Sequence, residues 1–165
     1  MVKSVFHKKL MNTDFAIIVF NQNSKLTNRL VEVAFDEVEN LISKYSRFLP
    51  GSEISQINNS ELSKIEIKPE MYSFCKYCNE IGNLTDGVFD YTILDLLQAI
   101  GYSKSYVEGE NFSQKSIEQI QRLIKKRKNF LDIKLIKEDN KYYISKDPEI
   151  KIEFGGFMKG YAVDK

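Results

Sequence analysis

Apolar and polar residues alternate at the start of the chain, and this pattern predicts two strands between residues 2 and 20. Val2, Ser4 and Phe6 form the alternating set of the first strand. After a polar turn at residues 11–14, every position from Phe15 to Phe20 is apolar. Because an uninterrupted apolar run is typical of a strand covered on both sides, we expect the second strand to be buried on both faces.

Spacings of three and four residues then predict a long amphipathic helix that begins near Asn23 and Ser24. Its apolar positions are Leu26, Leu30, Val33, Ala34, Val38, Leu41, Ile42 and Tyr45. Pro69 suits the first turn of a second helix, which runs to about Leu84, and further helices are expected at residues 92–100 and from Ile117. The basic run at residues 125–128 is interpreted as the solvated C-terminus of that last helix, where cations oppose the helix dipole.

Residues 46–59 show little periodicity and contain a Pro-Gly pair, so they are expected to form a loop with a short helical turn. The remaining strand-like stretches lie near residues 131–137, 141–145 and 149–154, with a turn at residues 139–140. Helices interspersed with strands in this order predict an α+β fold, in which an antiparallel or mixed sheet packs against several helices.

Composition narrows the possible functions. The chain has 165 residues and 42% hydrophobic content, enough for the core of one domain. Lys and Arg (24) balance Asp and Glu (23), and the net charge of +1 provides no general attraction for nucleic acid or an anionic membrane. No run approaches the roughly 20 apolar residues of a membrane span. The first residues do not resemble a signal peptide, so a cytoplasmic location is expected.

Cys75 and Cys78 form a C-x-x-C pair. They share an apolar helical stripe with Tyr72 and Ile81, which favours buried core cysteines. The alternatives are a redox site and a zinc site, but zinc would need two more ligands, and His7 is the one histidine in the sequence.

The segment with the clearest chemistry lies near the end of the sequence. Residues 150–154 alternate as in a strand and lead into Gly155 and Gly156, after which a helix is expected to begin. Such a junction leaves backbone amides at the positive end of a helix dipole, where a diphosphate can bind, and Lys159 adds a positive charge. Ordinary turn chemistry explains the glycines equally well. The sequence ends at Lys165, early in this helix, so we expect the domain to be incomplete at its C-terminus.

Four separated segments resemble motifs of the ApbE family of FAD:protein FMN transferases. In order, residues 11–13 resemble its M-G-T turn, residues 46–58 its S-x-[FY]…S-E-[IL]-S…N loop, residues 85–92 its T-G-G-A-F-D-P-T segment and residues 153–164 its D-L-G-G-I-A-K-G-Y-A-V-D segment. Family members are about twice as long. The resemblance therefore implies that residues 1–165 are the N-terminal part of a single T-fold-like domain.

The family's reaction is what the resemblance implies for this chain. FAD would be the donor and Mg²⁺ would act at its diphosphate, where a cation stabilises charge on phosphoryl oxygens. A threonine of a target flavoprotein would receive FMN, and AMP would leave. Family members are often exported as lipoproteins, which differs from the location expected above.

Carried across position by position, the family's FAD contacts fall on Met11, Phe48, Val88, Phe89, Asp90, Glu153 and Lys159. Gly156 falls on a magnesium ligand, which would use its backbone carbonyl. Phe48 and Phe89 have an alternative role in the core, and Asp90 has one as a helix cap. The catalytic base is expected outside this segment.

Several positions depart from the family pattern: Asn12, Asp86, Tyr91, Glu153 and Met158. Glu153 stands where aspartate is usual. A second functional hypothesis is therefore a truncated or degenerate module that binds FAD without catalysing transfer. An interaction scaffold without a ligand is a third.

Overall fold

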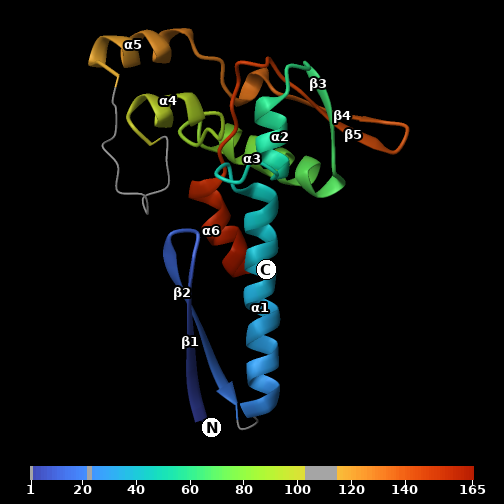
Figure 1. Cartoon of the computed structure of the whole chain (residues 1–165). Coiled ribbons are helices and arrows are strands. Elements are labelled where there is room, and N and C mark those ends of the chain that lie inside the picture. The colour runs from blue at the N-terminus through green and yellow to red at the C-terminus, as the bar shows by residue number, and fades with distance from the viewer. Residues whose placement is uncertain (1, 22–23, 103–114) are drawn as a thin grey trace.

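The computed structural model describes residues 2–21, 24–102 and 115–165. Figure 1 shows a body of helices and a small sheet at one end of the long helix α1 (Ser24–Tyr45). A hairpin of β1 (Val2–Leu10) and β2 (Thr13–Asn21) lies along the other end of that helix. The predicted α+β class and the predicted start of the long helix are confirmed.

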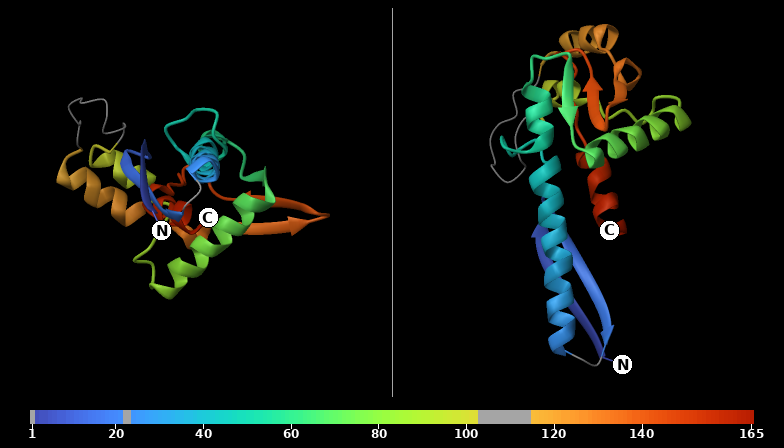
Figure 2. Two further views of the ribbon diagram at one scale, coloured as in Figure 1. Left: turned by 90° about the horizontal axis from the view of Figure 1, so that it is seen from below. Right: turned by 90° about the vertical axis from the view of Figure 1, so that its right-hand side faces the viewer.

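The hairpin is antiparallel, with Val5 opposite Ile18. Its two-residue turn places Met11 and Asn12 at φ angles of 51° and 56°, as the right-handed twist of a tight hairpin requires. One face packs on α1, and the side view in Figure 2 shows the hairpin lying along the helix. Ile18 and Phe20 point the other way and are 52% and 60% exposed. The prediction that this strand is buried on both faces is wrong, because the described residues cover only one face of the hairpin.

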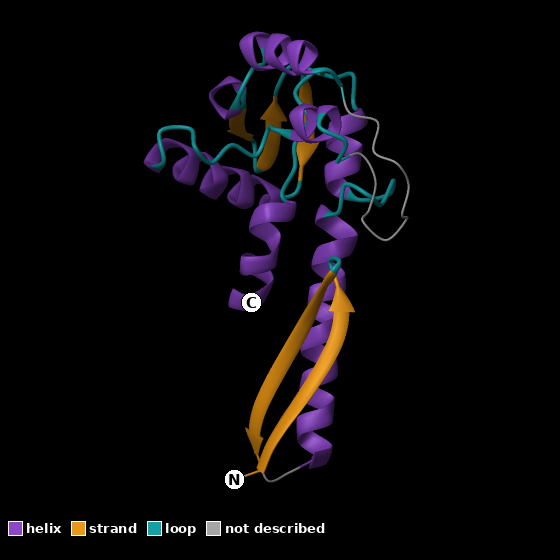
Figure 3. Ribbon diagram, turned by 90° about the vertical axis from the view of Figure 1, so that its left-hand side faces the viewer, coloured by secondary structure: helices purple, strands orange, loops and turns teal. Residues whose placement is uncertain are grey.

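The body is built around α2 (Glu53–Asn59), α3 (Pro69–Leu84) and a three-stranded sheet. Antiparallel pairs join β3 (Lys64–Ile67) to β5 (Lys141–Ser145), and β5 to β4 (Lys134–Glu138). The short helix at α2 and the hairpin turn between β4 and β5 were predicted, whereas β3 was not. Figure 3 shows the sheet and the hairpin at separate ends of the structure.

The strand predicted at residues 149–154 is absent from the structure. Ile150, Ile152 and Phe154 are buried, as the alternation requires, but the segment pairs with no strand. The side-chain amide of Asn58 donates to the carbonyl of Ile152 (2.8 Å), and its oxygen accepts from the Ile152 amide (2.7 Å). A buried backbone needs hydrogen-bond partners, and here one side chain supplies what a neighbouring strand would.

The remaining helices are α4 (Leu94–Ala99), α5 (Ile117–Lys126) and α6 (Gly155–Asp164), near the predicted places. A single 3-10 turn at Phe130–Asp132 precedes β4, so the predicted strand at 131–137 begins three residues late. No helix in the described part of the chain is long and apolar enough to span a membrane.

Cys75 and Cys78 are fully buried and unbonded to each other, which confirms their role in the core. Burial disfavours the thiolate, so it raises the pKa of Cys78 to about 12 and also raises the pKa of Cys75. Among the residues that the structure describes, no group of three or more His, Cys, Asp and Glu side chains could hold a metal ion.

Candidate functional site

A pocket of about 920 Å³ opens where the hairpin turn, the end of α1 and the start of α6 meet. This volume lies in the range of roughly 300–1,000 Å³ that is usual for small-molecule sites. The eight residues that the resemblance assigned to FAD or magnesium all lie on its wall, although they come from four separate segments: Met11, Phe48, Val88, Phe89, Asp90, Glu153, Gly156 and Lys159.

Aromatic and aliphatic side chains form much of the wall. Phe48 is 43% exposed, so its alternative role as a core residue is wrong. Phe89 is partly buried against the core, and its ring centroid lies 5.9 Å from that of Phe157 in an edge-on arrangement. Val88 is almost fully exposed. Exposed ring faces and aliphatic groups of this kind suit a flat heterocycle.

Glu153 is held at the start of α6 by two contacts. One carboxylate oxygen, Oε1, accepts a hydrogen bond from the Gly155 amide, and the other, Oε2, forms an ion pair with Nε of Arg47. The side chains of Arg47 and Glu153 are 6% and 12% exposed. A Cβ atom on residue 155 would lie 2.5 Å from Oε1, so any larger residue there would require the carboxylate to move.

This arrangement changes the predicted glycine cradle. The helix begins at Gly155 itself, without a preceding strand, and the amide of Gly155 already donates to Glu153. Gly156 differs, because a Cβ at that position would meet nothing within 4 Å. Lys159 lies one turn further along α6 and also lines the pocket. An anion in the pocket would therefore approach Gly156 and Lys159, not the amide of Gly155.

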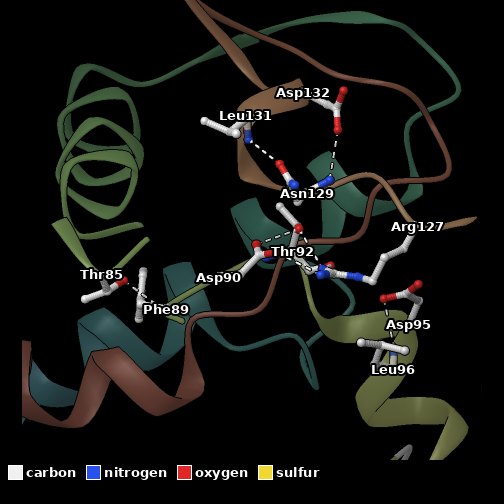
Figure 4. Close-up of polar contacts among 10 residues, drawn as sticks. All are labelled: Thr85, Phe89, Asp90, Thr92, Asp95, Leu96, Arg127, Asn129, Leu131 and Asp132. Atoms are coloured by element: carbon white, nitrogen blue, oxygen red, sulfur yellow. Dashed lines mark hydrogen bonds and ion pairs between the residues drawn. The ribbon is translucent and has the colours of Figure 1, made fainter. Parts of the chain in front are cut away.

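Asp90 is fixed by a second buried network, drawn in Figure 4. Oδ1 accepts from the amide and the hydroxyl of Thr92 (2.9 and 2.7 Å), and Oδ2 pairs with Arg127 (2.9 Å). Arg127 also donates to the carbonyl of Thr92 (3.0 Å). Asp90 does not cap α4, whose N-cap is Ile93 without a side-chain bond. The interpretation of residues 125–128 as solvated is wrong for Arg127, because its guanidinium is the partner of a buried carboxylate.

The loop that carries Val88 and Phe89 is held from its other end by Thr85. The Thr85 hydroxyl accepts from the amide of Phe89 (3.0 Å) and donates to the carbonyl of Ile81 (2.9 Å). Tyr91, at a position where the family pattern has proline, is buried and stacks on Phe154 at 5.6 Å between ring centroids. Two pocket residues are thus presented by a loop that is bonded at both ends.

Sequence reasoning gave no role to Arg47 or Tyr102, and it did not foresee that Arg127 would pair with Asp90. Arg47 and Tyr102 line the pocket, and Arg127 stands behind Asp90. A usable signal was available, because a carboxylate expected in an apolar pocket requires a cation or several donors nearby. The sequence offers many arginines and lysines, however, and does not say which one folds against which acid.

The metal prediction has less support from the side chains. Gly156 lies on the pocket wall, and its carbonyl is one possible ligand. Magnesium prefers several oxygen ligands in octahedral geometry. The described residues contain no cluster of three acidic or other metal-ligating side chains, so they do not form a magnesium site by themselves.

Comparison with known proteins identifies the family of the chain. Residues 11–165 match the model of the ApbE family. A Chlamydia muridarum protein named FAD:protein FMN transferase is 26% identical over 180 residues, and the match covers 98% of this chain and 50% of that protein.

Solved structures show the same fold. The crystal structure of the ApbE protein from Thermotoga maritima has 26% identity and a TM-score of 0.83, and the match covers 99% of this chain and 50% of that one. The flavin transferase ApbE from Vibrio cholerae has 20% identity and a TM-score of 0.76, with 99% and 51% covered, and supports the fold alone. This chain spans about half the length of these relatives. Since the family model matches nearly all of its residues, the chain belongs to the ApbE family.

Proposed function

We propose that the chain is part of an FAD:protein FMN transferase, and that its pocket binds FAD. The transferase would move FMN from FAD to a threonine of a target flavoprotein in a magnesium-dependent reaction. One observation carries the proposal: residues from four segments that are far apart in the sequence line a single pocket of suitable size. The curated relative named for this activity supports it.

The wall residues suit the parts of FAD. Phe48, Val88 and Phe89 offer ring faces and aliphatic contacts to a flavin or an adenine. Lys159 offers an ammonium group to a phosphate, which makes a charge-assisted hydrogen bond. Asp90 and Glu153 already form hydrogen bonds or ion pairs with other protein groups. These carboxylates therefore fix the backbone and the charge of the pocket wall.

Bond by bond, the reaction is a substitution at phosphorus. The threonine hydroxyl oxygen attacks the phosphorus on the FMN side, the bond from that phosphorus to the bridging oxygen breaks, and AMP leaves with that oxygen. The hydroxyl proton must go to a base, which the described residues do not identify. Magnesium, when bound, would stabilise charge on the diphosphate, but further ligands would be needed from outside the described residues.

Binding and transfer are tested separately. Titration of FAD with the chain, followed by flavin fluorescence, should show saturable binding that Lys159→Ala weakens. Lys165→Ala is the matched control, because that lysine directly follows α6 and does not line the pocket. Equal affinities of the two variants would remove Lys159 from the site.

Transfer is measured by mass as FMN on a threonine of a candidate flavoprotein, together with AMP release, in Mg²⁺ and in EDTA. Release of AMP and covalent FMN only in Mg²⁺ would support the transferase. FAD binding without either product, in a preparation that includes the remaining half found in relatives, would favour the alternative of a degenerate FAD-binding module.

A further inference from the structure

We infer that Arg47 is a positioning residue, which cancels the charge of Glu153 so that the pocket can accept a diphosphate. The inference rests on the proposed binding of FAD. It concerns a residue to which the resemblance gave no role, and it follows from the contacts that the buried side chain of Arg47 makes with Glu153, Phe48 and Tyr102.

Arg47 is held on three sides. Its Nε pairs with Glu153, and one terminal nitrogen donates to the main-chain carbonyl of Tyr102 (2.7 Å). The guanidinium carbon lies 4.2 Å from the centre of the Phe48 ring. Because the side chain is nearly fully buried and committed to these groups, it is poorly placed to follow a ligand into the pocket.

Glu153 is the group that makes a neutralising cation necessary. Its carboxylate lies at the N-terminus of α6, the place where an anionic ligand would otherwise gain from the helix amides. A carboxylate there without a partner would repel a diphosphate strongly, since charges in partly buried sites are poorly screened. Arg47 removes this repulsion while leaving the carboxylate on the amide of Gly155.

The charges of the described wall residues then balance in pairs. Arg47 cancels Glu153, and Arg127, behind the wall, cancels Asp90. Of the charged residues on the described wall, Lys159 is the one that forms no ion pair with another described residue. The pocket would thus offer one positive charge to a diphosphate, and loss of Arg47 would turn this into a neutral site with a carboxylate facing the ligand.

Three ligands and two variants separate this role from a direct contact. FAD and ADP carry a diphosphate, whereas riboflavin carries the flavin ring without phosphate. Arg47→Met should weaken binding of FAD and ADP by roughly tenfold or more, and should leave riboflavin binding nearly unchanged. The double variant Arg47→Met with Glu153→Gln should recover most of the lost affinity, because it removes the unbalanced carboxylate as well.

Each contrary result has a distinct meaning. If the double variant binds ADP as weakly as the single one, Arg47 contacts the phosphate directly and the inference is overturned. If riboflavin affinity falls as much as ADP affinity, Arg47 is merely structural. If the unaltered chain binds FAD and ADP not at all, it is the proposed function that fails.

A variant that keeps Arg47 provides a second test in case Arg47→Met does not fold. Glu153→Gln alone leaves the buried guanidinium without a negative partner, so it should bind ADP more tightly than the unaltered chain. Unchanged or weaker ADP binding by this folded variant, checked by its thermal melt, would also overturn the inference. Lys165→Met serves as the control for loss of one positive charge away from the pocket.

Discussion

The two halves of helix α1 have similar apolar patterns and very different surroundings. Leu41, in the C-terminal half, is fully buried among α2, α3 and α6, whereas Leu30, in the N-terminal half, is 57% exposed. Val33 is exposed on the same side as Leu30. Figure 3 shows the body closing around one end of the helix and the hairpin lying along the other. At that end the buried residues are Val31 and Phe35, on the neighbouring face of the helix (3% and 4% exposed). Periodicity therefore predicts that a helix forms, but not which of its faces the neighbouring elements cover.

The strands repeat this contrast. Ile144 on β5 is fully buried in the body, while Ile18 and Phe20 on β2 are exposed on the open face of the hairpin. Exposed apolar positions of this kind contribute little to the stability of the described residues. Stability should therefore be concentrated in the body, and substitutions of the same type should have unequal effects at the two ends.

The largest expected effect comes from Leu41→Ala, with Leu30→Ala as the matched control on the same helix. Loss of the buried side chain leaves a cavity and should lower the free energy of unfolding by about 2–5 kcal/mol. Leu30→Ala should change it by less than about 0.5 kcal/mol. Urea unfolding followed by circular dichroism measures both. Equal losses would mean that the open end of α1 is covered in solution, and would break the comparison.

A smaller effect is expected from Lys146, which the body buries. Desolvation, aided by Lys151, lowers its pKa from 10.5 to about 8, although Asp147 and Glu61 act in the opposite direction. Between about pH 8 and 10.5 the unfolded chain therefore holds more protons at this group than the folded chain, so stability should rise with pH in that window. Below pH 8 Lys146 is charged in the folded chain as well, so the full cost of burying that charge lowers the free energy of unfolding.

Lys146→Met should remove this pH dependence and raise the free energy of unfolding at pH 7 by roughly 1–2 kcal/mol. Urea unfolding at pH 7.5 and pH 9.5 tests both statements. The control is Lys141→Met, because Lys141 is exposed and pairs with Glu66 on the surface. If the free energy of unfolding rises equally in the unaltered chain and in the Lys146 variant between the two pH values, another group causes the pH dependence.

Most of the fold could be predicted because its elements are long and locally determined. The hairpin, α1 and α3 each carry their own periodicity, and Pro69 marks the start of α3. The failures have two causes, which are a dependence on a distant partner and the shortness of an element. The segment at 149–154 alternates like a strand but is bonded by Asn58, and β3 has only four residues, too few for a clear pattern.

The site shows the same division. The resemblance located eight residues, and all of them line one pocket, because motifs in a family mark the segments that meet there. What it could not supply were the ion-pair partners. Arg127 lies 37 residues from Asp90, and the chain between them includes two helices and residues 103–114, outside the described structure. Such a pairing follows from the tertiary fold, which no local pattern contains.

The smallest expected effect on stability distinguishes Gly155 from Gly156, two adjacent glycines in the first turn of α6. A side chain at residue 155 would meet a neighbour, whereas one at residue 156 would not. In Gly155→Ala the new Cβ would collide with the Glu153 carboxylate, which Arg47 holds in place, so stability should fall by about 1 kcal/mol. Gly156→Ala meets no neighbour and gains helix propensity, so stability should be unchanged or rise by up to about 1 kcal/mol. Thermal melts measure both changes.

FAD titration of the same two variants then tests whether the open space beside Gly156 belongs to the ligand. If a diphosphate or its metal approaches this backbone closely, Gly156→Ala should weaken FAD binding while the protein stays as stable as before, because the methyl group occupies space that only the ligand needs. Full FAD affinity in a stable Gly156→Ala variant would instead place the ligand elsewhere in the pocket, and would leave Gly156 as an ordinary residue of the first turn of α6.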